Sequence, residues 1–305
     1  MARKRSKSPS KKKKSPAKKR KASKSPAKKK SKAKTTKAAG GSTKARNSLY
    51  FVTFIMAFYM LTYFGVMGDP WAKFFGRPNS AGPLCGDLTT WMGLMLFAYS
   101  LNNTNYLLNG NESDQKKLLF TRSMQFTVWF MMVVTGGRQG APGGHGLMVD
   151  SEYFQAIACC FFTGWVCKLG SEGFTPSPGK VDTGSAVTRC FLVFAAFIML
   201  NTFTIGVMGG DTYYPPGASV SADCANNCAW FASMVYLQFI DVFSACQGGS
   251  DAVKKGVFAN YVIINVIGTI LLLVRADHFD AAGLQLGMAV NAIQVGTGVY
   301  GYLQL

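Results

Sequence analysis

Charged side chains are scarce in most of this sequence. The chain has 305 residues, and residues 1–47 contain 21 of its 33 lysines and arginines but none of its 14 acidic residues. The other 258 residues carry only 26 charged groups, about a tenth, whereas a soluble domain has about a quarter. This shortage excludes an ordinary soluble protein and predicts that the region after residue 47 is embedded in a membrane.

Catalytic and metal-binding motifs are also lacking. The sequence has two histidines, His145 and His278, and one histidine beside a few carboxylates is a weak metal site. No Gly-x-Ser-x-Gly, His-x-x-x-His or phosphate-binding Gly-Lys-Ser/Thr motif occurs. We therefore expect no metal, no cofactor and a function other than catalysis.

Residues 1–47 contain no aromatic side chain and, after Met1, no large aliphatic one. Such a segment cannot bury enough apolar surface to offset the entropy of folding, so we expect it to be disordered. No apolar run and cleavage site follow the charges, which excludes a secretory signal peptide. Its three Ser-Pro sites place Ser8, Ser15 and Ser25 before a proline, which makes them candidates for phosphorylation.

The tail also contains a short repeat, because KSPAKK occurs at residues 14–19 and again at 24–29. These units resemble linker-histone tails, which implies a nucleic-acid partner bound largely through phosphate charge. Two other interpretations stay open. The tail can be a cytoplasmic orientation signal that contacts anionic lipid headgroups, or a nuclear localisation signal or other partner site.

Eight apolar segments are long enough to cross a bilayer, which takes about 20 helical residues for ~30 Å of hydrocarbon. They predict an all-α polytopic membrane bundle of eight transmembrane helices. Gly and Pro residues mark the breaks between segments. The segments are about 48–67, 88–108, 118–136, 152–169, 187–208, 229–247, 256–274 and 281–303.

Basic residues in the predicted loops indicate the orientation, because cytoplasmic loops carry an excess of Lys and Arg. With the tail in the cytoplasm, the loops on that side hold Lys116, Lys117, Arg122, Lys168, Lys180, Arg189, Lys254 and Lys255, and those on the other side hold Lys73, Arg77, Arg138 and Arg275. Both termini are therefore predicted to be cytoplasmic. An endomembrane (the ER or nuclear envelope) is favoured over the plasma membrane.

The two halves of the apolar region share landmarks in the same order, about 140 residues apart. GVMGD at residues 65–69 corresponds to GVMGGD at 206–211, and Trp91 corresponds to Trp230. Four spans are an even number, so both copies would insert in the same direction as a parallel repeat. The predicted division is a tail at 1–47, a four-helix module at 48–170, a linker at 171–186 and a second four-helix module at 187–305.

One part of the first module resembles a known family. Residues 70–76 (PWAKFFG), followed by Thr-Trp-x-Gly-x-x-Leu from Thr90, resemble small four-helix membrane proteins of the DoxX-like type. The resemblance implies an architecture of tandem four-helix membrane modules and no catalytic residue.

Asp241 is an acidic residue well inside a predicted span, where a charge costs roughly 2.5–3.5 kcal/mol. It should therefore face the bundle interior, and Asn260 at a similar depth of the next span is its expected partner. Further polar candidates within spans are Asn201, Asn265, Asn291, Gln125 and Gln294. These residues are interpreted either as interhelical hydrogen-bonding groups or as a solute or proton pathway in which Asp241 titrates.

Three of the eight cysteines, Cys85, Cys224 and Cys228, lie in predicted outside loops. An oxidising compartment would permit one disulfide there, between Cys85 and either of the other two.

Together these patterns predict a non-enzymatic membrane protein whose tail docks on anionic lipid or nucleic acid. The first alternative is a small-solute or proton-coupled transporter or channel that uses the polar interior. A membrane enzyme of lipid metabolism is the third.

Overall fold

The computed structural model is all-helical in the part of the chain that it describes. Described are residues 43–75, 82–137, 148–177, 179, 181–206, 208, 213–215 and 222–305, without the side chains of 75 and 222–226. Most of the predicted tail, and with it the predicted disorder, lies outside these residues.

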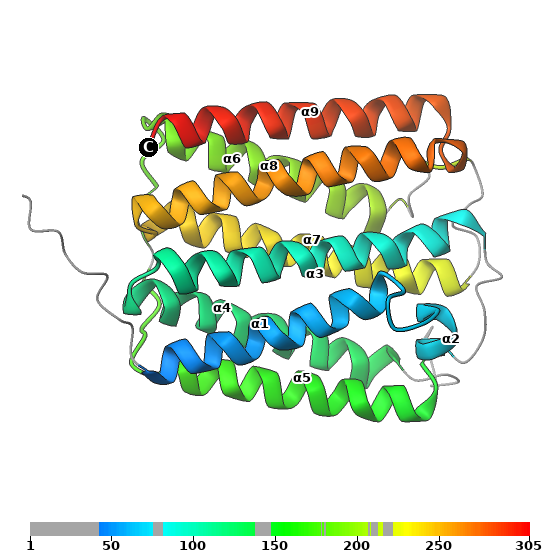
Figure 1. Ribbon diagram of the computed structural model, residues 1–305, viewed down its shortest axis with the longest axis horizontal. Coiled ribbons are helices and arrows are strands. Elements are labelled where there is room, and N and C mark those ends of the chain that lie inside the picture. The colour runs from blue at the N-terminus through cyan, green and yellow to red at the C-terminus, as the bar shows by residue number, and fades with distance from the viewer. Residues whose placement is uncertain are drawn as a thin grey trace, which may run out of the picture. The chain divides into compact units, whose positions relative to one another are not determined.

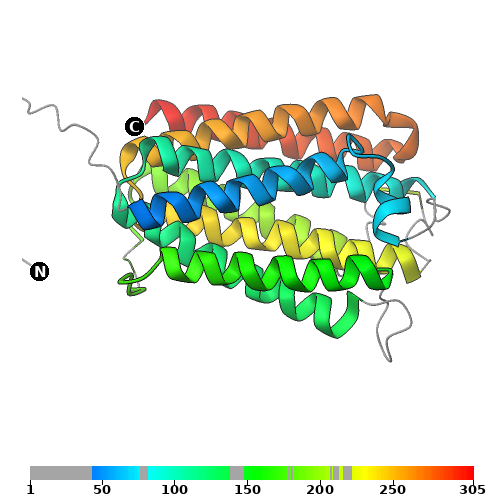
Figure 2. The same cartoon turned by 60° about the horizontal axis from the view of Figure 1, so that its bottom comes forward.

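Eight long helices follow the eight predicted segments in order and run side by side (Figures 1 and 2). They are α1 (Thr43–Tyr63), α3 (Pro83–Asn109), α4 (Glu112–Met132), α5 (Asp150–Gly170), α6 (Ala186–Gly206), α7 (Ala222–Gly248), α8 (Asp251–Val274) and α9 (Ala281–Leu303). Shorter elements are α2 (Pro70–Phe75), a π-helical turn at Val133–Gly137 and a 3-10 turn at Ala276–His278. All the helices belong to one compact unit, residues 38–305.

Among the described residues, four helical stretches are long and apolar enough to cross a membrane. They are Glu112–Gly136, Ala186–Gly206, Asn227–Gly248 and Asp251–Val274. These stretches indicate a membrane protein, as the scarcity of charge predicted. Four predicted segments, 48–67, 88–108, 152–169 and 281–303, are not among them. In the first of these, helix α1 ends at Tyr63, so that the apolar residues Val66 and Met67 fall outside it.

The packing of the helices places α3 and α7 at the centre. Helix α1 packs on α3 and α5, and α6 packs on α7 and α9; α4 packs on α5, and α8 on α9. Helix α3 also contacts α7 and α8, and α7 also contacts α4. Polar side chains on α3 and α7 can therefore meet those on α4 and α8 away from the outer surface.

Two-residue turns fix the starts of α4 and α8. Asn111 begins α4 with a capping box, in which its side chain accepts from the Asp114 backbone N–H at 2.9 Å and the Asp114 carboxylate accepts from the Asn111 N–H at 3.2 Å. Ser250 caps α8 by accepting from the Val253 N–H at 3.4 Å. Each cap satisfies a backbone donor at the helix start. The tight turns make α4 and α8 antiparallel to the helices before them.

Candidate functional site

A fully buried ion pair joins α4 to α7 in the bundle interior. The side chains of Arg122 and Asp241 are 0% and 2% exposed, and Nη2 of the arginine lies 2.7 Å from Oδ2 of the aspartate. Nη1 donates a hydrogen bond to Oδ1 at 2.8 Å, whereas the Nη2 contact is a close approach of charges without hydrogen-bond geometry. The planar guanidinium therefore faces both carboxylate oxygens, an arrangement that lysine could not make.

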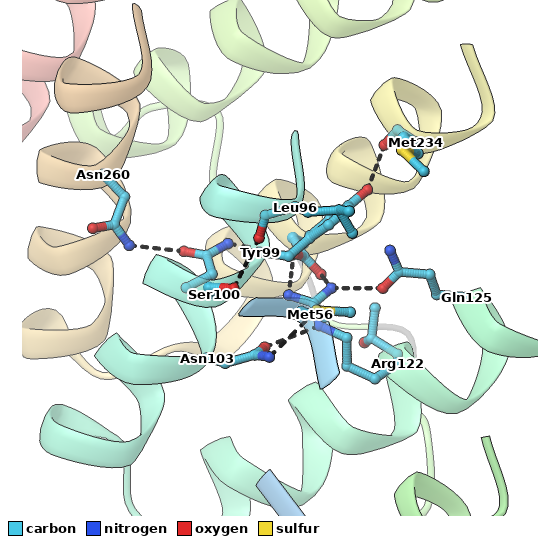
Figure 3. A network of polar contacts seen from close by, with 12 residues as sticks. Met56, Leu96, Tyr99, Ser100, Asn103, Arg122, Gln125, Met234 and Asn260 are labelled. Atoms are coloured by element: carbon cyan, nitrogen blue, oxygen red, sulfur yellow. Dashed lines mark hydrogen bonds and ion pairs between the residues drawn. The ribbon is translucent and has the colours of Figure 1, made fainter. Parts of the chain in front are cut away.

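Neutral groups surround the guanidinium of Arg122 (Figure 3). Its Nε donates to Oδ1 of Asn103 at 3.0 Å, and Nη1 also donates to Oε1 of Gln125 at 3.0 Å. The ring of Tyr99 lies 4.7 Å from the guanidinium carbon, close enough for a cation–π interaction. The Tyr99 hydroxyl itself donates to the Met234 carbonyl oxygen on α7. A buried charge needs such additional partners because its lost hydration is otherwise uncompensated.

On the other side of the pair, two asparagines extend the network to α3 and α8. Asn102 donates to Oδ2 of Asp241 at 3.3 Å, and Asn260 donates to Oδ1 of Asn102 at 3.2 Å. The predicted partner Asn260 thus reaches Asp241 through Asn102. The network draws on four helices, α3, α4, α7 and α8.

A small cavity of about 20 Å³ adjoins Asp241, between α3, α7 and α8. This is enough for about one water molecule. Gln238, Asn260 and Tyr261 line it, and the buried Tyr261 hydroxyl has no hydrogen-bond partner among the described residues.

A larger cavity of about 150 Å³ lies between α3, α6, α7, α8 and α9. Its wall is mostly apolar, with amide side chains from Asn201, Gln238, Asn265, Asn291 and Gln294. Gln238 and Tyr261 line both cavities. The larger cavity therefore extends to the wall beside Asp241.

A second buried carboxylate, Asp87 at the start of α3, lies at the edge of the larger cavity. It is 1% exposed, forms an ion pair with Arg275 and lies 2.9 Å from Nδ1 of His278. Arg275 also donates to the Thr90 hydroxyl at 2.9 Å, and the Tyr214 hydroxyl donates to Asp87 at 3.3 Å. Burial, and then the nearby Asp87 carboxylate, raise the pKa of Tyr214 well above its usual value, which keeps the phenol protonated as a donor. The cluster ties α3 to the α8–α9 turn.

The interior residues predicted from the sequence fall into two groups. Asp241 and Asn260 belong to the ion-pair network, whereas Asn201, Asn265 and Asn291 line the larger cavity. Within the second group, Asn201 accepts from the Tyr213 hydroxyl at 2.9 Å, and Asn265 donates to the Tyr261 carbonyl oxygen at 2.8 Å. A role for either group in transport stays a prediction.

The prediction that Arg122 lies in a cytoplasmic loop is wrong. Residue 122 already falls within the predicted segment 118–136, and counting its charge as a loop charge was the error, because Arg122 lies in α4 (Glu112–Met132) and is fully buried. Two signals in the sequence pointed to it. Gln125 and Trp129 follow at helical spacing on the same face, and a lone acidic residue inside a span calls for a counter-charge. Asn102 and Asn103 carried no comparable signal.

Among the predicted disulfide residues, Cys85 is disulfide-bonded and buried. Cys228 is also buried, on α7, whereas the side chain of Cys224 lies outside the described residues. The pairing therefore stays a prediction. Ser8, Ser15 and Ser25 lie outside the described residues too.

No group of three or more His, Cys, Asp or Glu side chains that could hold a metal ion occurs in the part of the chain that the structure describes.

Replacing Asp87 by asparagine should destabilise the bundle, because the partly buried Arg275 loses its buried counter-charge. Hydrogen bonds to charged groups contribute roughly 1.5–3 kcal/mol, so we expect a loss of about 2 kcal/mol in the free energy of unfolding. Thermal unfolding in detergent measures it. Asp277→Asn in the same turn is the matched control, since Asp277 is exposed and should change stability by less than about 0.5 kcal/mol. Equal effects of the two substitutions would contradict the role of Asp87.

Comparisons with protein families, with curated proteins and with solved structures found no match. The likeness of residues 70–76 and 90–94 to DoxX-like proteins therefore stays a resemblance of a few residues. The geometry of the buried network and its cavities is what carries the functional argument.

Proposed function

We propose that this protein is an integral membrane protein that binds a small solute inside its helix bundle and conducts it across the membrane. The observation that carries the proposal is the interior cavity of about 150 Å³, whose wall at Gln238 and Tyr261 adjoins Asp241. A solute in this cavity meets buried amide groups and lies next to the Arg122–Asp241 network. Such polar groups inside membrane bundles commonly mark solute or ion pathways.

The outer surface of the bundle supports the proposal that all eight long helices cross the membrane, and not only the four that are apolar enough by composition. Large apolar side chains are more than half exposed on α8, which is one of these four, and also on α1, α5 and α9, which are not. They are Phe54 (66%), Phe162 (60%), Trp165 (57%), Val274 (74%) and Leu303 (72%). Exposed apolar surface on this scale is unusual in a soluble protein and is typical of a membrane interaction surface. Helices α1, α5, α8 and α9, which carry these side chains, therefore face lipid in the proposal, and the central helices α3 and α7 cross the membrane between their neighbours.

The internal repeat is supported by matching helix lengths and contacts. Helices α3 and α7 each have 27 residues, and a two-residue turn follows each of them. The packing of α1 on α3 and α5 has its counterpart in that of α6 on α7 and α9. These correspondences favour two parallel modules, residues 48–170 and 187–305.

The distribution of basic residues supports cytoplasmic termini. The start of α1 and the C-terminus lie at the same end of the bundle (Figure 1), where the Lys44 side chain at the start of α1 also pairs with Glu172 after α5. Removing the buried Arg122 from the loop count leaves the excess of basic residues on that side. The positive-inside rule then places this end in the cytoplasm.

Cysteine labelling with a small, membrane-impermeant thiol reagent tests the orientation and the pathway together. Added from outside, it should modify Pro215→Cys but not Thr183→Cys, because these exposed positions lie at opposite ends of the bundle. It should also modify Asn291→Cys in the cavity wall, but not Leu273→Cys, which is 54% exposed on the apolar outer surface.

Reversed labelling of positions 215 and 183 would overturn the orientation. Protection of position 291 from both sides would contradict a solute pathway through this cavity.

A second function, docking of the tail on an anionic surface, is favoured by the 21 basic and no acidic residues of the segment 1–47. Near an anionic leaflet each Lys or Arg contributes up to about 1 kcal/mol, so a few contacts suffice. Nucleic acid offers the same charge, in which case binding releases counterions and falls with salt. An ER or nuclear-envelope location would expose the tail to either surface.

A peptide of residues 1–46 should bind anionic vesicles or duplex DNA at low salt and lose affinity progressively as salt is added. Phosphorylation of Ser8, Ser15 and Ser25 adds about −1.5 to −2 charge units at each site. The phosphorylated peptide should therefore bind more weakly without losing binding altogether. Equilibrium titration of both peptides measures this, and salt-independent binding would instead indicate a specific receptor.

A further inference from the structure

Every side chain that lines the larger cavity is uncharged. The charges beyond its wall are paired, Arg122 with Asp241 at 2.7 Å and Asp87 with Arg275. Transferring an ion from water into a site without a counter-charge is strongly unfavourable. The cavity therefore selects against charged molecules and accepts neutral ones.

Three polar side chains in the cavity wall are largely buried. Gln238, Gln294 and Tyr261 are 8%, 5% and 9% exposed, and the buried Tyr261 hydroxyl has no hydrogen-bond partner among the described residues. Buried polar groups are almost always hydrogen-bonded, and leaving one unsatisfied costs about 1–3 kcal/mol. These groups offer both donors and acceptors, so the complementary molecule carries both as well.

The rest of the wall indicates the size and shape of that molecule. Aromatic rings from Trp91, Phe231, Tyr261 and Phe279 contribute to the wall, and flat rings stack favourably with aromatic side chains. A cavity of about 150 Å³ has the volume that holds a benzene-sized molecule in other proteins. The wall thus fits a single planar ring with polar substituents at its edge.

We propose that this cavity binds a neutral, planar molecule of one ring that carries a hydrogen-bond donor and an acceptor. Its polar edge lies toward Gln238 and Tyr261, the residues shared with the small cavity beside Asp241, and Gln294 from α9 binds a second polar group. The inference rests on the proposed function for how the molecule arrives, but binding itself requires no transport.

Three matched probes test the chemistry on the purified full-length protein in detergent. Benzamide is neutral with an amide, benzoate has the same shape with a negative charge, and benzene has the ring alone. Ligand-observed NMR should give a dissociation constant for benzamide that is about tenfold or more lower than for the other two, because a site with unpaired polar groups rejects analogues that cannot pair with them. Equal affinity for benzamide and benzene would overturn the claim that polar groups of the ligand are recognised. Tighter binding of benzoate than of benzamide would overturn the claim that the ligand is neutral.

Variants show whether the binding occurs in this cavity. Gln238→Leu should bring the affinities for benzamide and benzene within about threefold, since Gln and Leu side chains are similar in size and the hydrogen bonds of Gln238 to the polar edge are lost. Val290→Phe, which fills the cavity from α9, should weaken binding of both. Gln304→Leu is the matched control, because Gln304 is exposed and outside the cavity wall. Unchanged benzamide binding in both cavity variants, with cooperative unfolding retained, would overturn the assignment.

The outcome is distinguishable from failure of the proposed function. If benzamide does not bind while Asn291→Cys is labelled from outside, the ligand class is wrong and the pathway stands. If benzamide binds as expected while Asn291→Cys is protected from both sides, the cavity is a closed binding site and conduction is wrong.

Discussion

The buried ion pair between Arg122 and Asp241 is the interaction on which the interior of this bundle depends. Two ions that have lost their water are tolerable only when each compensates the other and neighbouring groups hydrogen-bond to both. Asn103 and Gln125 accept hydrogen bonds from Arg122, and the ring of Tyr99 lies over its guanidinium. Asn102 donates a hydrogen bond to Asp241. Since Arg122 belongs to α4 and Asp241 to α7, the pair also fixes how the two halves of the chain meet.

The neutrality of the pair has a consequence for the cavity beside it. An unpaired Asp241 would place a negative charge behind the wall formed by Gln238 and Tyr261, and the cavity would then favour cations. With Arg122 in place, the cavity has an apolar and amide lining without net charge. A polar interior inside helices with an apolar outer surface is the arrangement that a membrane-embedded binding site requires.

Much of the fold could be predicted from the sequence because apolar runs of helical length leave few alternatives. The eight segments appear as eight long helices in the predicted order. Helix starts were less predictable, because the capping box of Asn111 and Asp114 begins α4 among polar residues that resemble a loop. The assignment of Arg122 to a loop was a separate error, because residue 122 already lay within the predicted segment 118–136.

The candidate site was predictable only in part. Asp241 was identifiable because it is an isolated acid in an apolar run. Its partner is 119 residues away, and no sequence spacing relates them, because tertiary packing of α4 against α7 selects the pair. The same holds for Asp87 and Arg275, which are 188 residues apart. The neutral cavity is likewise a product of five helices and has no local sequence signal.

The most direct test of the central role of the ion pair is a double-mutant cycle with Arg122→Met and Asp241→Leu, in which the free energy of unfolding is measured in detergent. Each single substitution leaves an unpaired buried charge and should cost about 3–5 kcal/mol. The double variant leaves no buried charge and should lose much less than the sum of the two single losses. A double variant whose loss equals that sum would show that the two side chains do not stabilise each other, and would contradict the account.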